Sequence, residues 1–261
     1  MSQPFPVTAQ MVVKNEDRFV WFAIKSILPY VEKFLITDNG SVDQTRAIIE
    51  SFNDQKIIFE TQNGNIVKIR QNQLLKTKTP WFLLIDGDEV WPQRQLIELL
   101  QLTKDLPKEK IAAVNETKNC VGDVWHCSPK EAGKYHLGKW QGNLNIRLMR
   151  TLPYKIVGTY PWEEYQLGGK PINEMTDRLV YSNSWYLHLS HLNRSSSQAK
   201  TLGRRRLLIE KGENLKSSQL PEVFFARYPA TISDPLARRD FWYELKANLL
   251  TPIKKIKRQI C

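Results

Sequence analysis

The chain has 261 residues, of which 41% are hydrophobic and 25% charged. These ordinary proportions exclude disorder of the whole chain, and the length allows a sizeable core in one α/β domain with an appendage or in two small domains. Without a signal-like N-terminus or any apolar run approaching the ~18 residues that cross a bilayer, we expect a protein that is neither secreted nor membrane-spanning.

The formal net charge of +11 is concentrated near the C-terminus. Residues 200–261 contain 14 Lys and Arg against 6 Asp and Glu, a net charge of +8. Such a segment indicates phosphate groups as partners, on lipid or nucleic acid, or serves solubility alone. The three cysteines lack CxxC spacing, so we expect a reducing compartment, the cytoplasm.

Strands and helices are predicted to alternate over the first hundred residues. Apolar runs at 7–13, 31–37, 57–59 and 81–85 predict strands, and the segments 14–28, 43–52 and 70–78 predict helices. This alternation predicts a parallel, doubly wound sheet with right-handed crossovers. Neither GxGxxG nor GxxxxGK[ST] occurs, which disfavours a dinucleotide fold and removes the P-loop.

Acidic residues follow two of these strands. Asp86 and Asp88 end the fourth, and ligands of open α/β sheets bind at the carboxyl ends of strands. With Gly87 between them, the two carboxylates can bind Mg²⁺ or Mn²⁺ beside phosphate oxygens, or instead form a turn that caps the next helix. Asp38 ends the second strand, where it can bond a base or ribose or form an Asx turn.

Four motifs in chain order resemble those of the family 2 glycosyltransferases of GT-A fold. They are MVVKNED at 11–17, ITDNGSVDQT at 36–45, Arg70 sixteen residues before Asp86, and IDGDE at 85–89. The family pattern is roughly vKNE, DnGSxDxT, RN and DxDE, and the resemblance covers residues 6 to about 100. It departs at Gln71, where Asn is usual, and at Thr37, where a second Asp is common.

The resemblance implies a nucleoside-diphosphate sugar, UDP-linked by default, bound across the strand ends. Asp88 would coordinate Mn²⁺ or Mg²⁺, Asp86 would contact ribose or metal, and Arg70 would lie near the nucleotide and brace Asp86. The other implied nucleotide-binding residues are Val12, Val13, Lys14, Asn15, Glu16, Asp38 and Gly87.

The second half is expected to bind the acceptor. Strand-like segments at 111–125 and 143–149 flank a loop at 126–141 that is rich in glycine, lysine and aromatic residues. Because sugars stack on aromatic faces, the candidates for acceptor binding are Trp125, Tyr135, Trp140 and Trp162. The alternative is a mobile surface loop with some core aromatics.

An inverting transferase needs a carboxylate that takes the proton of the attacking hydroxyl. Glu163 and Glu164 lie in an apolar stretch, where desolvation raises the basicity of a carboxylate, and related enzymes carry a Glu-ending motif at this place. We favour Glu163 over Glu164 as the base. The alternative is that both glutamates are surface acids that pair with nearby lysines. His188 and His191 end a later strand and should point to different faces, and we choose His191 as a metal ligand over a structural histidine.

The C-terminal region is predicted to be helical, at 204–209 and 235–250, with isoleucines and basic residues alternating after Pro252. An apolar face beside Lys and Arg suits either an anionic membrane surface, contacted through residues 235–261 by a peripheral protein, or packing on the catalytic domain or a second subunit. We divide the chain into a GT-A domain at 1–195, with a nucleotide-binding half (1–100) and an acceptor-binding half (101–195), and a basic extension at 196–261.

The predicted function is metal-dependent, inverting transfer of a sugar to a hydroxyl of a glycan, a lipid-linked acceptor or a protein. A sugar-nucleotide nucleotidyltransferase of similar fold is an alternative, although residues 14–16 are not the glycine-rich basic loop that it needs. A non-catalytic sugar- or nucleic-acid-binding protein is another. We expect no nucleic-acid partner, because acids rather than basic residues gather at the strand ends.

Overall fold

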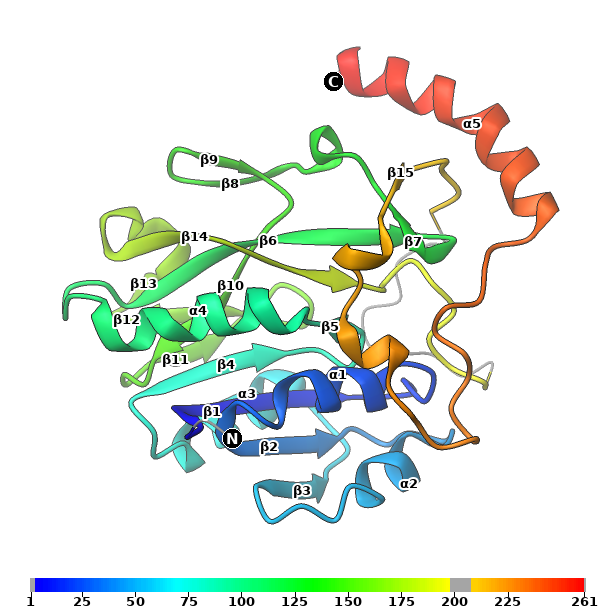
Figure 1. The fold of residues 1–261 in the computed structure, drawn as a ribbon. Coiled ribbons are helices and arrows are strands. Elements are labelled where there is room, and N and C mark those ends of the chain that lie inside the picture. The colour runs from blue at the N-terminus through cyan, green and yellow to red at the C-terminus, as the bar shows by residue number, and fades with distance from the viewer. Residues whose placement is uncertain (1–2, 198–207, 261) are drawn as a thin grey trace.

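The protein is built around a ten-stranded mixed sheet (Figure 1). The computed structural model describes residues 3–197 and 208–260. The first half contains β1 (Phe5–Val13), α1 (Val20–Ile27), β2 (Val31–Asp38), α2 (Thr45–Glu50), β3 (Ile57–Thr61), α3 (Ile66–Lys76), β4 (Trp81–Ile85), β5 (Glu89–Val90) and α4 (Gln93–Asp105). The second half contains β6 (Ala112–Val121), β7 (Asp123–Cys127), β8 (Tyr135–Leu137), β9 (Trp140–Gly142), β10 (Leu144–Arg150), β11 (Lys155–Val157), β12 (Glu164–Leu167), β13 (Lys170–Pro171), β14 (Leu179–His188), β15 (Glu213–Asn214) and α5 (Phe241–Ile260).

The strand order is β15-β7-β6-β10-β4-β1-β2-β3, with β14 paired to β5 and β6. β1 pairs in parallel with β2 and β4, and β2 pairs in parallel with β3, so the predicted α/β alternation and mostly parallel sheet are confirmed. The carboxyl ends of β1, β2 and β4 therefore lie at one edge of the sheet.

The central strand β4 is buried on both faces. Trp81, Leu83 and Ile85 pack into the core formed with α1, α2 and α4, whereas Phe82 and Leu84 pack into a second core under α3. Figure 1 shows α1 and α4 in front of the sheet and α3 behind it. This explains why the sequence of β4 is continuously apolar rather than alternating.

The helices α1 and α3 begin several residues away from their predicted starts. α1 begins at Val20 rather than directly after Val13, because Asn15 takes a left-handed conformation (φ 55°) that interrupts regular structure. α3 begins at Ile66, four residues before Arg70, because the side chain of Asn65 accepts a hydrogen bond from the amide of Lys68 at 3.3 Å and caps the helix.

Antiparallel elements complete the second half of the sheet. β10 is inserted between β4 and β6 and runs antiparallel to both. The loop predicted between 126 and 141 contains part of the hairpin β8–β9, and β11, β12 and β13 form a separate small sheet.

The C-terminal region returns to the main sheet before α5. β15 pairs with β7, and Leu215, Leu220, Phe224 and Ile232 join the core that also contains α1. α5 begins at Phe241 rather than at 235 and continues through Pro252. Most of the helix predicted at 204–209 lies outside the described residues. Within the described parts of the chain, no helix combines the length and hydrophobicity needed to cross a bilayer.

Candidate active site

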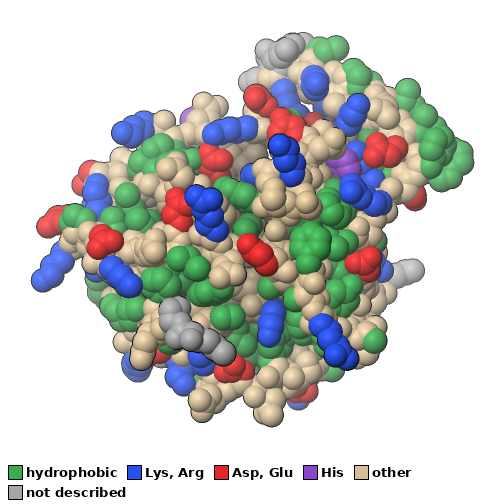
Figure 2. Space-filling view, in the orientation of Figure 1, with side chains coloured by type: hydrophobic (Ala, Val, Ile, Leu, Met, Phe, Trp, Pro, Cys, Tyr) green, Lys and Arg blue, Asp and Glu red, His purple; other side chains and the backbone are tan. Residues whose placement is uncertain are grey.

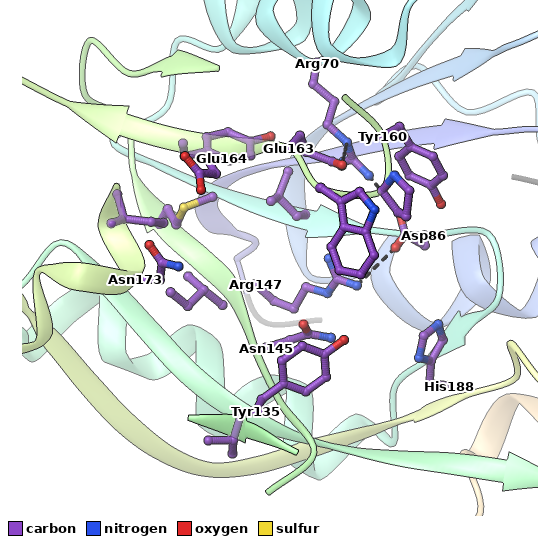
Figure 3. A pocket seen from close by; sticks show the side chains of 18 of the residues that line it. Arg70, Asp86, Tyr135, Asn145, Arg147, Tyr160, Glu163, Glu164, Asn173 and His188 are labelled. Atoms are coloured by element: carbon purple, nitrogen blue, oxygen red, sulfur yellow. Dashed lines mark hydrogen bonds and ion pairs between the residues drawn. The ribbon is translucent and has the colours of Figure 1, made fainter. Parts of the chain in front are cut away.

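A cavity of about 930 Å³ opens at the carboxyl end of β4 (Figure 3). Its wall comes from both halves of the chain: Asp86 and Asp88 follow β4, Arg70 comes from α3, Arg147 from β10, and residues 160–165 form another side. The site is therefore assembled from segments that are far apart in the sequence.

Asp86 is held by two arginines. Nη2 of Arg70 lies 3.0 Å from Oδ1 of Asp86, and Nη2 of Arg147 lies 3.1 Å from Oδ2. Burial alone would raise the pKa of Asp86, but the two guanidinium groups outweigh it and hold the pKa below its usual value. Arg147 also contacts Glu89, whose pKa burial raises to about 7 in spite of that contact.

Asp88 belongs to a second charged cluster. Nη1 of Arg194 lies 2.6 Å from Oδ2 of Asp88 and 2.9 Å from Oε1 of Glu16, and Nε2 of His188 lies 3.5 Å from the same oxygen of Asp88. Burial opposes ionisation of Asp88, yet Arg194 and His188 lower its pKa. Burial raises the pKa of Glu16 well above its usual value, because Arg194 compensates only in part.

The residues around Asp88 fit a divalent cation. Asp88 and His188 both line the cavity and supply an oxygen and a nitrogen donor within 3.5 Å of each other. Burial raises the pKa of the neighbouring Glu16 and Glu89 in spite of the arginines beside them, and a bound cation would favour the charged form of both carboxylates. The described residues contain no group of three or more metal-binding side chains, but Mg²⁺ commonly takes one or two protein ligands and completes its shell with phosphate oxygens and water.

Glu163 and Glu164 differ in their surroundings. Oε1 of Glu163 forms an ion pair with Nε of Arg70 at 3.1 Å, and the side chain is only 13% exposed. Its other oxygen, Oε2, is buried without a hydrogen-bond partner in the described structure. Glu164 is exposed and accepts a hydrogen bond from Gln166 at 3.3 Å. Both glutamates line the cavity, and Glu163 is the one joined to the Asp86 cluster.

The predicted nucleotide-binding residues at the ends of β1 and β2 do not line the cavity. Asp38 is 1% exposed and accepts hydrogen bonds from the amide and hydroxyl of Ser41, which is the turn considered as its alternative role. Gly87 touches the end of β1: a Cβ atom there would lie 2.8 Å from Cγ2 of Val13 and 3.0 Å from Cγ of Glu16. The lining of the cavity does not include residues 12–16 or Asp38.

The predicted aromatic residues separate into two groups. Tyr135 and Trp162 line the cavity, and Trp162 is 76% exposed. Trp125, in the middle of β7, instead packs under the guanidinium of Arg238 at 3.9 Å and lines a second, smaller pocket. Trp140 stacks on a tyrosine of β14 at 5.6 Å and does not line the cavity.

Three residues of the site were not assigned a role from the sequence. The structure places His188 at Asp88, because β14 ends at His188 opposite Glu89. Arg147 and Arg194 also lie in the cavity wall. A charged residue within an apolar strand such as β10 signals a buried acidic partner, and this signal could have identified Arg147.

The fold is of the α/β class, with a charged cavity at the carboxyl end of a central parallel strand. The profile of "Glycosyl transferase family 2" matches residues 8–161, more than half of the chain, and the chain belongs to this family. No curated protein sequence matches this chain.

Solved structures are also similar to the chain, at low sequence identity. Glucosyl-3-phosphoglycerate synthase of Mycobacterium tuberculosis, solved in complex with Mn²⁺, UDP and glucosyl-3-phosphoglycerate, is 15% identical with a TM-score of 0.37 over 45% of each chain. TarS (residues 1–349) of S. aureus is 14% identical with a TM-score of 0.49, over 70% of this chain and 60% of that one. The chain thus spans less than two thirds of either protein.

Proposed function

We propose that the protein transfers a sugar from a nucleoside-diphosphate donor, UDP-linked by default, to a hydroxyl of a glycan, a lipid-linked acceptor or a protein, with inversion at the anomeric carbon. The observation that carries the proposal is the position of Arg70. Its guanidinium contacts Asp86 at 3.0 Å and Glu163 at 3.1 Å, so one buried side chain joins the end of β4 to the proposed base. Residues 1–100 would bind the donor, and residues 101–195 the acceptor.

The arginines are suited to hold the diphosphate. Arg70, Arg147 and Arg194 all reach the cavity, and burial of their guanidinium groups strengthens interactions with anions. Nη1 of Arg70 is buried without an acceptor in the described structure, and an oxygen of the bound donor would satisfy it. The raised pKa of Arg70 keeps it charged, because Asp86 and Glu163 outweigh the effect of burial.

Glu163 is positioned to act as the general base. The acceptor oxygen forms a bond to the anomeric carbon while the bond to the diphosphate breaks, and the proton of the acceptor hydroxyl passes to Glu163. The unpartnered Oε2 can receive that proton while Oε1 stays oriented by Arg70. Trp162 and Tyr135 offer aromatic faces at the same cavity for the acceptor sugar.

Asp88 and His188 would hold Mn²⁺ or Mg²⁺. When bound, this ion supplies positive charge that stabilises the negative charge of the departing diphosphate. Arg194 pairs with Asp88 and with Glu16 and so orients the carboxylate of Asp88 at the cavity.

Calorimetric titration tests the donor site. The protein is titrated with UDP, GDP, CDP and dTDP, each with and without Mn²⁺, and we expect metal-dependent binding of one nucleotide. Asp88→Asn should abolish that metal dependence, whereas the same change at Asp105, an exposed residue at the end of α4, should leave it intact. Equal binding by Asp88→Asn would refute the metal assignment, and a folded protein that binds none of the nucleotides would refute the donor site.

A further inference from the structure

The outer side of α5 is unusually apolar for a surface. Among the described residues, thirteen large hydrophobic side chains are exposed, and seven of them belong to this helix: Phe241, Trp242, Leu245, Leu249, Leu250, Ile253 and Ile256. Figure 2 shows hydrophobic side chains along the outer edge of the protruding helix. A contiguous exposed apolar patch of this kind marks a site of interaction with a protein, a membrane or a ligand.

The opposite side of α5 attaches the helix to the protein. Ala247 and Thr251 are buried there, and the hydroxyl of Tyr243 donates a hydrogen bond of 2.8 Å to a main-chain carbonyl. Arg258 forms two bonds, of 2.7 and 2.8 Å, to the carboxylate of Glu210, whose side chain is 1% exposed. These contacts fix the rotation of the helix about its own axis.

The apolar residues face away from that attachment. With about 3.6 residues per turn, Trp242, Leu249 and Ile253 project roughly opposite Ala247 and Thr251. An ordinary surface helix packs its apolar face on the core and presents its polar face to water. In α5 the apolar face points outward, so packing on the protein's own core does not explain these residues.

Positive charge borders the apolar face. α5 contains five Lys and Arg and one acidic residue, Glu244. Lys246, Lys255 and Lys257 are exposed and, by helical spacing, lie along both sides of the apolar residues. Apolar and aromatic side chains bordered by lysine are the pattern of helices that lie in the interface of an anionic bilayer.

We infer that α5 docks the protein on the surface of an anionic lipid bilayer, with its apolar side chains inserted among the headgroups and its lysines near the lipid phosphates. A second copy of the chain fits less well, because two such helices would bring lysines against lysines, and like charges across an interface are unfavourable. The inference concerns a surface that takes no part in the proposed sugar transfer.

Vesicle co-sedimentation of the full chain tests the inference. The lipids are phosphatidylcholine alone and phosphatidylcholine mixed with phosphatidylglycerol. We expect binding to the mixed vesicles that weakens with added salt, and at least a tenfold loss of binding in Leu249→Gln/Ile253→Gln. The matched control is Leu75→Gln: Leu75 lies on α3 and is 67% exposed, against 66% for Leu249, so the substitution is the same at equal exposure.

Three outcomes would overturn the inference. They are failure of the unmodified protein to bind the mixed vesicles, equal binding to neutral and anionic vesicles, and full binding by the double variant. Light scattering identifies the competing occupant: a dimer that the double variant loses, without vesicle binding, would assign the face to a second copy. No nucleotide is present, so failure of this experiment leaves the proposed donor site untouched.

Discussion

Replacement of Arg147 by methionine should expose the electrostatic cost of the buried cluster. The side chain of Arg147 is 11% exposed and that of Glu89 fully buried, and the two are in contact. Removing one partner of a buried ion pair costs about 3–5 kcal/mol. Asp86 keeps Arg70, and Glu89 can take up a proton, so we expect a cost of roughly 1 kcal/mol at pH 5.5, where Glu89 is already protonated. At pH 8, one unit above the pKa of Glu89, we expect about 2 kcal/mol, because each pH unit above that pKa adds at most about 1.4 kcal/mol.

The sign of this pH dependence follows from Glu89. Its pKa is raised from 4.5 to about 7, so the folded state holds a proton that the unfolded state has lost between these values. Protonation of Glu89 therefore stabilises the folded state by about 3 kcal/mol. This contribution is complete below pH 4.5 and decreases as the pH rises to about 7. Loss of Arg147 raises the pKa of Glu89 further. The loss of unfolding free energy caused by Arg147→Met therefore grows above pH 7.

Urea denaturation at the two pH values measures both effects. In the double variant Arg147→Met/Glu89→Gln, the loss of stability should no longer depend on pH, because the group that titrates, Glu89, has been replaced by an amide. Arg46→Met is the control, because Arg46 and Glu50 form an exposed pair whose loss should cost less than about 1 kcal/mol. A cost for Arg147→Met below 1 kcal/mol at pH 8, or an equal cost at both pH values, would refute the reasoning.

Further predictions concern the base and the turn residues. Glu163→Gln should keep nucleotide affinity and slow sugar transfer by about 10²–10⁴-fold, measured as released nucleotide; unchanged turnover would move the base elsewhere. Gly87→Ala should cost about 1–3 kcal/mol, because its Cβ would lie 2.8 Å from Val13, and a melting temperature like that of the unmodified protein would contradict this. Asn15→Ala should cost about 1–3 kcal/mol in urea unfolding, since it loses a bond of 2.8 Å to the amide of Val42 and strains a left-handed residue; Asn15→Gly, which relieves the strain, should cost less.

The sequence predicts the first half of the fold well because the information there is local. The apolar run of β4 and the acids that follow it lie within ten residues, so the position of Asp86 at a strand end needs no knowledge of distant contacts. Arg147 and His188 reach the site only through the pairing of β10 with β4 and of β14 with β5. Such registers depend on residues that are far apart in the chain, and periodicity does not encode them.

The aromatic residues of the sequence predict the lining of the cavity less well than the strand ends do. Trp162 and Trp125 look alike in the sequence, yet only Trp162 borders the cavity. Burial of a tryptophan depends on which side of a strand it occupies and on what covers that side, and neither is determined locally.

The reversed direction of β10 has a consequence for how this enzyme can diversify. Because β10 runs against β4, the chain enters it from the edge of the sheet where the cavity opens, and the hairpin β8–β9 immediately precedes that entry. Residues of the hairpin can therefore be exchanged or lengthened without disturbing β1, β2 or β4. Under the proposed assignment, changes in this one hairpin would alter the acceptor side of the cavity and leave the strands of the donor side unchanged.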